Sequence, residues 1–89
     1  VNTAAVSTAT FSKALPADLT IDVTSTDATN AAKNVLLDGL PVGGIHLTAT
    51  GVDVTIESAY IAALVNGIYT ITVEFNKGNA VTVTLTVTA

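Results

Sequence analysis

The segment that constrains the fold most strongly is residues 69–75, where apolar and polar side chains alternate without interruption. The apolar members hold the odd positions: Tyr69, Ile71, Val73 and Phe75. Successive side chains of a β-strand point to opposite faces, so this pattern predicts a strand with one face in a core and one in solvent. A shift of one residue in its pairing would turn every apolar side chain outward, and the register is therefore strongly constrained.

Further segments are predicted as strands, some with equally regular alternation and some with a weaker pattern. The regular ones are residues 19–24, 52–57 and 81–88, and the weaker ones are residues 5–11, 34–40 and 45–50. About seven short strands, separated by turns rich in Gly and Asn, are typical of a sandwich of antiparallel sheets. The fold class predicted is therefore an all-β antiparallel sandwich.

The inward positions of these strands define an expected hydrophobic core. Its members are Ala9, Phe11, Leu19, Ile21, Val23, Leu47, Val54, Ile56, Tyr69, Ile71, Val73, Phe75, Val83, Leu85 and Val87. In the weaker strand at 34–40, Val35 and Leu37 are expected to face inward as well. The opposite parity carries mostly Thr, Asp and Glu, which indicates a solvated outer face.

Residues 58–64 break the alternation just before the penultimate strand. Tyr60 and Leu64 are spaced i and i+4, Ser58 can cap a helical turn, and Asn66 with Gly67 can end it. We expect a helix of one to two turns that crosses from one sheet to the other and closes the end of the sandwich.

Gly67 and Tyr69 open the strand that follows this turn. A tyrosine near the start of a late strand is the residue that builds the tyrosine corner of immunoglobulin-like sandwiches. We therefore expect the Tyr69 ring to be buried, with its hydroxyl bonded to a backbone group within residues 63–66. The residues expected to hold the fold together are Gly67, Tyr69, Tyr60, Leu64, Phe75 and Phe11.

Charge and composition exclude several classes of function. The chain of 89 residues carries a net charge of −4, and its only basic residues besides His46 are the scattered Lys13, Lys33 and Lys77. Recognition of nucleic acid or of an anionic membrane surface is therefore not expected. The chain has no cysteine, hence no disulfide or thiolate ligand, and no apolar run of about 18 residues that would span a membrane.

No arrangement of residues predicts catalysis. His46 is the only histidine, and its parity places it on the solvent face, where a lone imidazole rarely binds a metal. The serines lack a Gly-x-Ser-x-Gly motif. Asp22, Asp53 and Glu74 occupy outward strand positions, which we interpret as solvated charge rather than as a glycosidase pair.

Binding of calcium or sugar is also weakly supported. Loop carboxylates suit calcium, but Asp18, Asp22, Asp27 and Asp38 do not form a D-x-D-x-D-G loop. Sugar-binding faces offer planar aromatic rings, and both tyrosines already have structural roles. We expect no cofactor and no metal site.

The order of these segments resembles that of X2-type immunoglobulin-like modules, found in bacterial cellulosomal scaffoldins and related exported multimodular proteins. The resemblance covers nearly the whole chain, and its most specific part is the Tyr-x-x-x-Leu-x-x-Gly-x-Tyr pattern of residues 60–69. It implies an immunoglobulin-like sandwich without catalytic activity, used as a spacer, as a solubility aid or for weak attachment to polysaccharide or cell wall. Residues 43–47 lack the tyrosine usual in the family, and residues 25–37 match poorly.

We therefore expect residues 1–89 to be one non-catalytic structural module, excised from a longer extracellular or cell-surface protein and packed against neighbouring modules or subunits. Val1 is not an initiating methionine, and the first residues lack the charged and apolar regions of a signal peptide, so we expect Val1 to be a cut inside a longer chain or a processed end. Alternatives are an immunoglobulin-like accessory domain of a phage virion protein, a weak polysaccharide- or cell-wall-binding module, and a fragment of a glycosidase.

Overall fold

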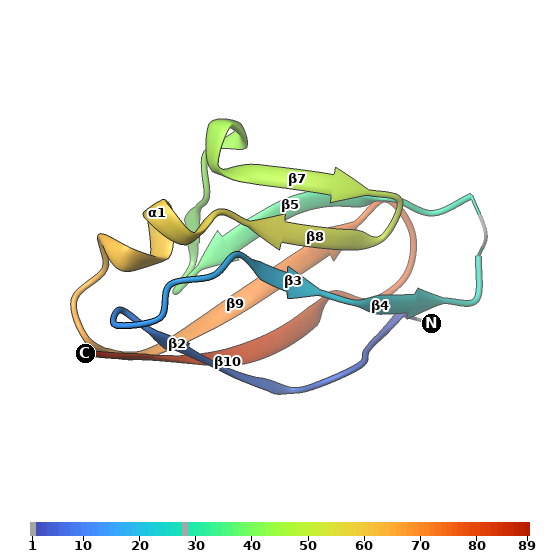
Figure 1. Cartoon of the computed structure of the whole chain (residues 1–89). Helices are drawn as coiled ribbons and strands as arrows, with labels where there is room; N and C mark the ends of the chain where they lie inside the picture. Colours follow the sequence, from blue (N-terminus) through green and yellow to red (C-terminus); the bar gives the residue numbers. More distant parts are fainter. Residues whose placement is uncertain (1, 28) are drawn as a thin grey trace.

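The computed structural model describes residues 2–27 and 29–89. It is a β-sandwich with one short α-helix at one end (Figure 1). The expected all-β, immunoglobulin-like sandwich is confirmed. Among the described residues, no helix is long and apolar enough to cross a membrane.

The larger sheet has five strands and forms one layer of the sandwich. In spatial order they are β2 (Thr8–Ser12), β10 (Val81–Thr88), β9 (Gly67–Phe75), β5 (Ala32–Leu37) and β6 (Leu40–Pro41). The β9–β10 and β5–β9 pairs are antiparallel, but β2 runs parallel to β10. The sheet is thus not purely antiparallel, contrary to the prediction.

The opposite layer consists of two smaller sheets. One has the order β3 (Leu19–Ile21), β8 (Asp53–Ile56) and β7 (Leu47–Thr50), and the other pairs β1 (Asn2–Ala4) with β4 (Val23–Ser25). The chain leaves β1 on this layer and enters β2 on the other. That crossing explains the parallel pair, because β2 approaches β10 from the opposite layer rather than through a hairpin.

Four predicted strands differ in detail from the observed elements. The strand expected at 5–11 begins only at Thr8, as β2, and the strand expected at 34–40 begins at Ala32 and ends at Leu37, as β5. The strand expected at 19–24 is divided at Asp22 into β3 and β4. The strand expected at 45–50 begins instead with a 3₁₀ turn, Gly44–His46, and only β7 is extended. The helix expected in 58–64 is present as α1 (Ser58–Ala62), but its C-cap is Ala63 and not Asn66 with Gly67 as expected, since Gly67 already begins β9.

The hydrophobic core lies between the layers. Its buried members are Phe11, Ile21, Val23, Val35, Leu37, Val42, Val54, Ile56, Ile61, Ile71, Val73, Phe75, Val81, Val83, Leu85 and Val87. The prediction omitted Val42, Ile61 and Val81, which lie outside or at the edge of the alternating segments. Four expected core residues are instead half-buried at the rim: Ala9, Leu19, Leu47 and Tyr69.

Candidate functional site

The start of α1 is held by a carboxylate from another loop. The Oδ1 atom of Asp18 accepts the Ser58 N–H at 2.8 Å, and no side chain of the helix's own first turn caps it. Ser58 therefore does not serve as the cap that the sequence predicted. Asp18 precedes β3, and its charge lies where the free N–H groups of a helix point.

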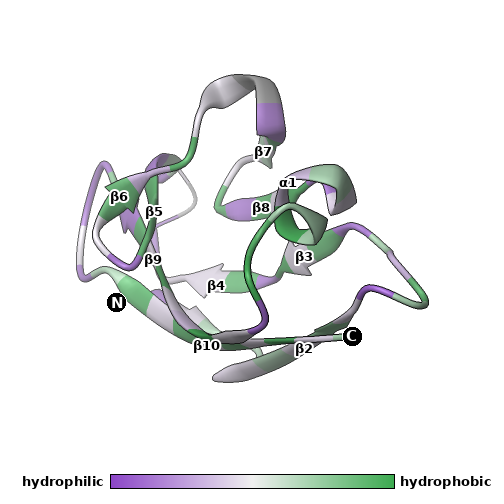
Figure 2. Ribbon diagram, turned by 90° about the vertical axis from the view of Figure 1, so that its left-hand side faces the viewer, coloured by the Kyte–Doolittle hydropathy of each residue, from purple (hydrophilic) through white to green (hydrophobic). Residues whose placement is uncertain are grey.

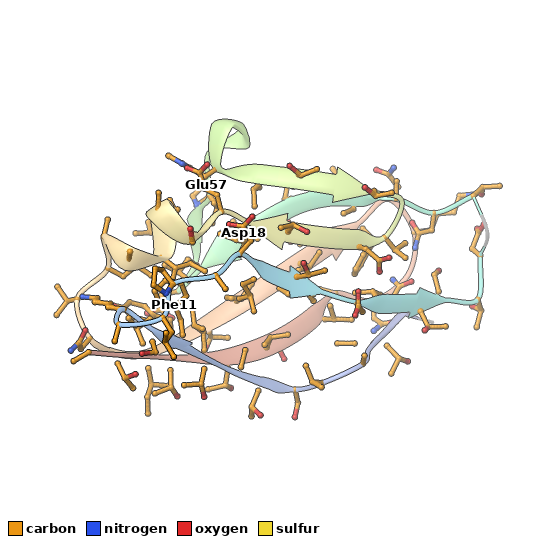
Figure 3. The ribbon with its side chains drawn as sticks, in the orientation of Figure 1. Phe11, Asp18 and Glu57 are labelled. Atoms are coloured by element: carbon orange, nitrogen blue, oxygen red, sulfur yellow. The ribbon has the colours of Figure 1, made fainter. Side chains whose placement is uncertain are left out.

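His46 and Glu57 meet beside this helix end, where Figure 3 labels both Glu57 and Asp18. The Nδ1 atom of His46 lies 2.6 Å from Oε1 of Glu57, and the His46 and Tyr60 ring centroids are 4.9 Å apart. The imidazole is 32% exposed. The prediction that it stands on an open solvent face is wrong, because the 3₁₀ turn breaks the strand parity on which it rested.

We call His46, Glu57 and Tyr60 the helix-end cluster. It is the part of the described structure that most resembles an acid–base site, since a carboxylate and an imidazole share a hydrogen bond. The two groups satisfy each other, and the Glu57 N–H also donates to the His46 carbonyl at 3.0 Å. Within the described residues, no three His, Asp or Glu side chains gather as metal ligands would. The cluster can therefore fasten the 3₁₀ turn to the start of α1.

Tyr69 makes the hydrogen bond expected of a tyrosine corner, but its ring is not buried as expected. The Tyr69 hydroxyl donates to the Val65 carbonyl, inside the range expected, while the ring remains half-buried. Tyr60 and Leu64 also pack half-buried against the core. Phe11 and Phe75 are buried, with exposures of 5% and 7%.

The loop aspartates bind backbone groups of the protein itself. Asp38 accepts the Thr70 N–H at 2.7 Å, and Asp27 accepts both the N–H and the hydroxyl of Thr29. The Lys77 Nζ lies 3.3 Å from Asp27 Oδ2. The Thr29 hydroxyl, then its N–H, then Lys77 lower the pKa of Asp27 to about 2. Asp22 is exposed.

Two strand carboxylates are half-buried, not simply solvated as expected. Asp53 Oδ1 accepts the Val23 N–H at 2.8 Å, which joins β8 to the break between β3 and β4. Glu74 Oε1 accepts from the Asn34 side chain at 3.2 Å across β9 and β5. Glu74 also borders a shallow, open depression of about 200 Å³, together with Lys33, Phe75, Gly78 and Ala80.

Sequence reasoning missed a cluster of three asparagines, which we call the asparagine clamp: Asn2, Asn30 and Asn79. Asn30 is buried, and its side-chain amide donates to Asn2 Oδ1 at 3.0 Å and to the Lys77 carbonyl at 2.8 Å. Asn79 Oδ1 accepts the Asn2 N–H at 2.8 Å. The clamp joins the first strand to the β9–β10 turn. The burial of Asn30 could not be predicted from the sequence, because asparagine in a predicted turn is normally exposed.

The outer face of the larger sheet is a neutral threonine surface. Its members, on three neighbouring strands, are Thr8, Thr10, Thr70, Thr72, Thr82, Thr84, Thr86 and Thr88. They lie in register, with Thr84 between Thr8 and Thr70. Ile68 is exposed on the same face, opposite Thr86, while the exposed Leu15 and Val65 lie elsewhere. All four aromatic side chains of the chain are buried or half-buried.

Comparison with solved structures finds the same fold in two larger enzymes. One is a tri-modular family 5 (subfamily 4) endo-β-1,4-glucanase from Bacillus licheniformis, in complex with cellotetraose, with a TM-score of 0.76 and 19% identity over 97% of this chain. The other is the tri-modular endo-β-1,4-glucanase B of Bacillus halodurans, with a TM-score of 0.77 and 17% identity over 97% of this chain. The chain spans 18% and 17% of their lengths. No curated protein matches it.

A family model covers almost the whole chain. The carbohydrate binding domain X2 matches residues 4–85, a range that holds every strand of the larger sheet at least in part, the helix-end cluster and Tyr69. This agrees with the X2-type resemblance drawn from the Tyr60-to-Tyr69 pattern. The chain belongs to the carbohydrate binding domain X2 family.

Proposed function

We propose that the chain is a non-catalytic accessory module of a multimodular extracellular protein that acts on polysaccharide. Its role is to hold the segments on either side of it apart in a fixed orientation and to pack against neighbouring modules. Family membership and the fold shared with modules of two tri-modular glucanases support the accessory role. They favour this reading over a virion domain.

The observation that carries the spacer role is the position of the first and last strands. The asparagine clamp fixes Asn2 to the β9–β10 turn, where β10 begins. The eight residues of β10 then run to Thr88 at the other end, a distance of about 27 Å at roughly 3.4 Å per residue. The long dimension of the molecule is 38 Å, and Figure 1 shows β1 and the end of β10 at opposite ends of it. Flanking segments would thus leave in opposite directions.

The alternative is a polysaccharide-binding module, which the family description favours. Tyr60 is the candidate for such contact, since its ring is half-exposed beside the polar groups of His46 and Glu57. Its ring packs against the core and against His46, however, and does not stand as an open platform. We therefore expect soluble oligosaccharides to bind no tighter than about 1 mM, or roughly −4 kcal/mol.

Two measurements test the proposal. The first is small-angle scattering of the multimodular protein, with the module intact or replaced by a flexible Gly/Ser segment of equal length. A rigid spacer predicts a narrower distribution of intermodule distances for the intact protein, with hydrolysis of soluble substrate unchanged in both. Equal distributions would contradict the spacer role.

The second measurement is calorimetry of the module with fragments of cellulose, chitin and peptidoglycan. Heats too small to fit agree with the spacer role. Micromolar binding that is lost in Tyr60→Ala, and retained in the matched control Tyr69→Phe, would establish the binding alternative instead. Because Tyr60 also packs on the core, the melting temperature of Tyr60→Ala must show that the variant is folded at the temperature used.

A further inference from the structure

The edge of the larger sheet at β2 is open. Figure 2, which looks along the strands, places β2 at the outside of its sheet. The Thr84 N–H donates to the Ser7 carbonyl at 2.9 Å, and the Lys13 N–H donates to the Thr88 carbonyl at 3.0 Å. In a parallel pair the backbone groups of alternate residues point toward the partner, so those of Thr8 and Thr10 point away from β10, along the free edge.

This edge carries none of the features that normally protect a strand from pairing. Residues 5–12 contain no charged residue and no proline, and no bulge interrupts the pairing of β2 with β10. The opposite edge of the same sheet differs, because β6 spans two residues and one of them is Pro41. An extended, uncharged edge strand is a template for another strand.

We propose that β2 is an interaction surface for a second copy of this chain, and that two β2 strands pair antiparallel around a two-fold axis at Thr10. Thr10 then faces Thr10 of the second copy, and Thr8 faces Ser12 of the second copy. The backbone N–H and C=O groups of Thr10 are exchanged between the copies. The two larger sheets become one continuous sheet.

The sequence of the edge is complementary to itself in this register. Lys13 lies opposite Ser7 of the second copy, so the two lysines are not opposed. Thr10 pairs with Thr10 and Thr8 pairs with Ser12 across the axis, which are favourable cross-strand combinations. The axis also makes the threonine surface continuous over both copies. A strand of five residues gives a small interface, so the dimer is weak and forms only at high protein concentration.

Sedimentation equilibrium over micromolar to millimolar protein tests the proposal. The mass should rise from the 9.0 kDa of the chain toward twice that value. Thr10→Lys places like charges opposite each other at the axis and should weaken association about five-fold at low salt. The matched control is Thr70→Lys, which puts the same charge on the same exposed face two strands away and should associate like the parent.

Two further variants separate pairing from a loss of folding. An equal mixture of Thr10→Lys and Thr10→Glu should associate more strongly than either alone, since unlike charges then face each other. Thr10→Pro removes the edge N–H without touching the ladder to β10, and it should abolish association while the far-ultraviolet spectrum stays that of the parent. A parent that is monomeric at millimolar concentration, or equal effects of Thr10→Lys and Thr70→Lys, would overturn the proposal.

Discussion

At the scale of single residues, Tyr69 shows how burial determines what a hydrogen bond contributes to the free energy of unfolding. The sequence predicted the bond to the 63–66 backbone, but the half-buried ring lets water reach the Val65 carbonyl. Tyr69→Phe should therefore cost only about 1 kcal/mol in the free energy of unfolding, measured by urea titration. Tyr60→Phe is the control and should be neutral, because the described structure gives its hydroxyl no partner. A loss of 3 kcal/mol or more for Tyr69→Phe would mean that the carbonyl is sealed from water.

Asp27 gives a second prediction for a single residue, which concerns how stability depends on pH. Its pKa is lowered to about 2 in the folded protein by Thr29 and Lys77, from 3.8. The ionised form is thus favoured by folding, so the contribution of Asp27 is fully present above about pH 4 and is lost as the pH falls through 2. Melting curves should show Asp27→Asn less stable than the parent at pH 6 and equal to it near pH 1.5. A constant difference at both pH values would argue against the ionised contact.

At the scale of elements, the asparagine clamp links segments far apart in the sequence. Asn30→Ala would leave the Lys77 N–H and the Asn2 Oδ1 atom without their partner, whereas the Lys77 carbonyl would keep its hydrogen bond from Asn2 Nδ2. We expect a loss of about 3 kcal/mol and faster amide exchange in β1. The matched control is Asn66→Ala, on an exposed loop, which should change stability by less than about 0.5 kcal/mol. Unchanged exchange in β1 would show that the clamp does not hold that strand.

Most elements with regular alternation were predictable, although the strand expected at 19–24 is divided at Asp22, and elements defined by distant contacts were not. The parity of β9 and β10 followed directly from their residues, because burial of one face leaves no freedom of register. The 3₁₀ turn at His46 and the cap from Asp18 depend on contacts with residues 11 and 40 positions away. Such contacts cannot be predicted from a local sequence pattern. The parallel placement of β2 likewise depends on where β1 leaves the other layer.

At the scale of the whole molecule, one core joins both layers, so a substitution that weakens the core should destabilise both layers together. Phe75 is 7% exposed and lies on β9, the strand that pairs with both β10 and β5. Phe75→Ala should cost about 3–5 kcal/mol, a large part of the 5–15 kcal/mol typical of such a domain. Leu40→Ala is the control, since Leu40 is 71% exposed on β6 and its substitution should change stability little.

The measurement is urea unfolding followed by both tyrosine fluorescence and circular dichroism. Coincident transitions shifted to lower urea in Phe75→Ala are expected, because the two layers share one core. Separate transitions for the two probes would mean that the layers unfold independently, and such a module could not hold its neighbours in a fixed orientation.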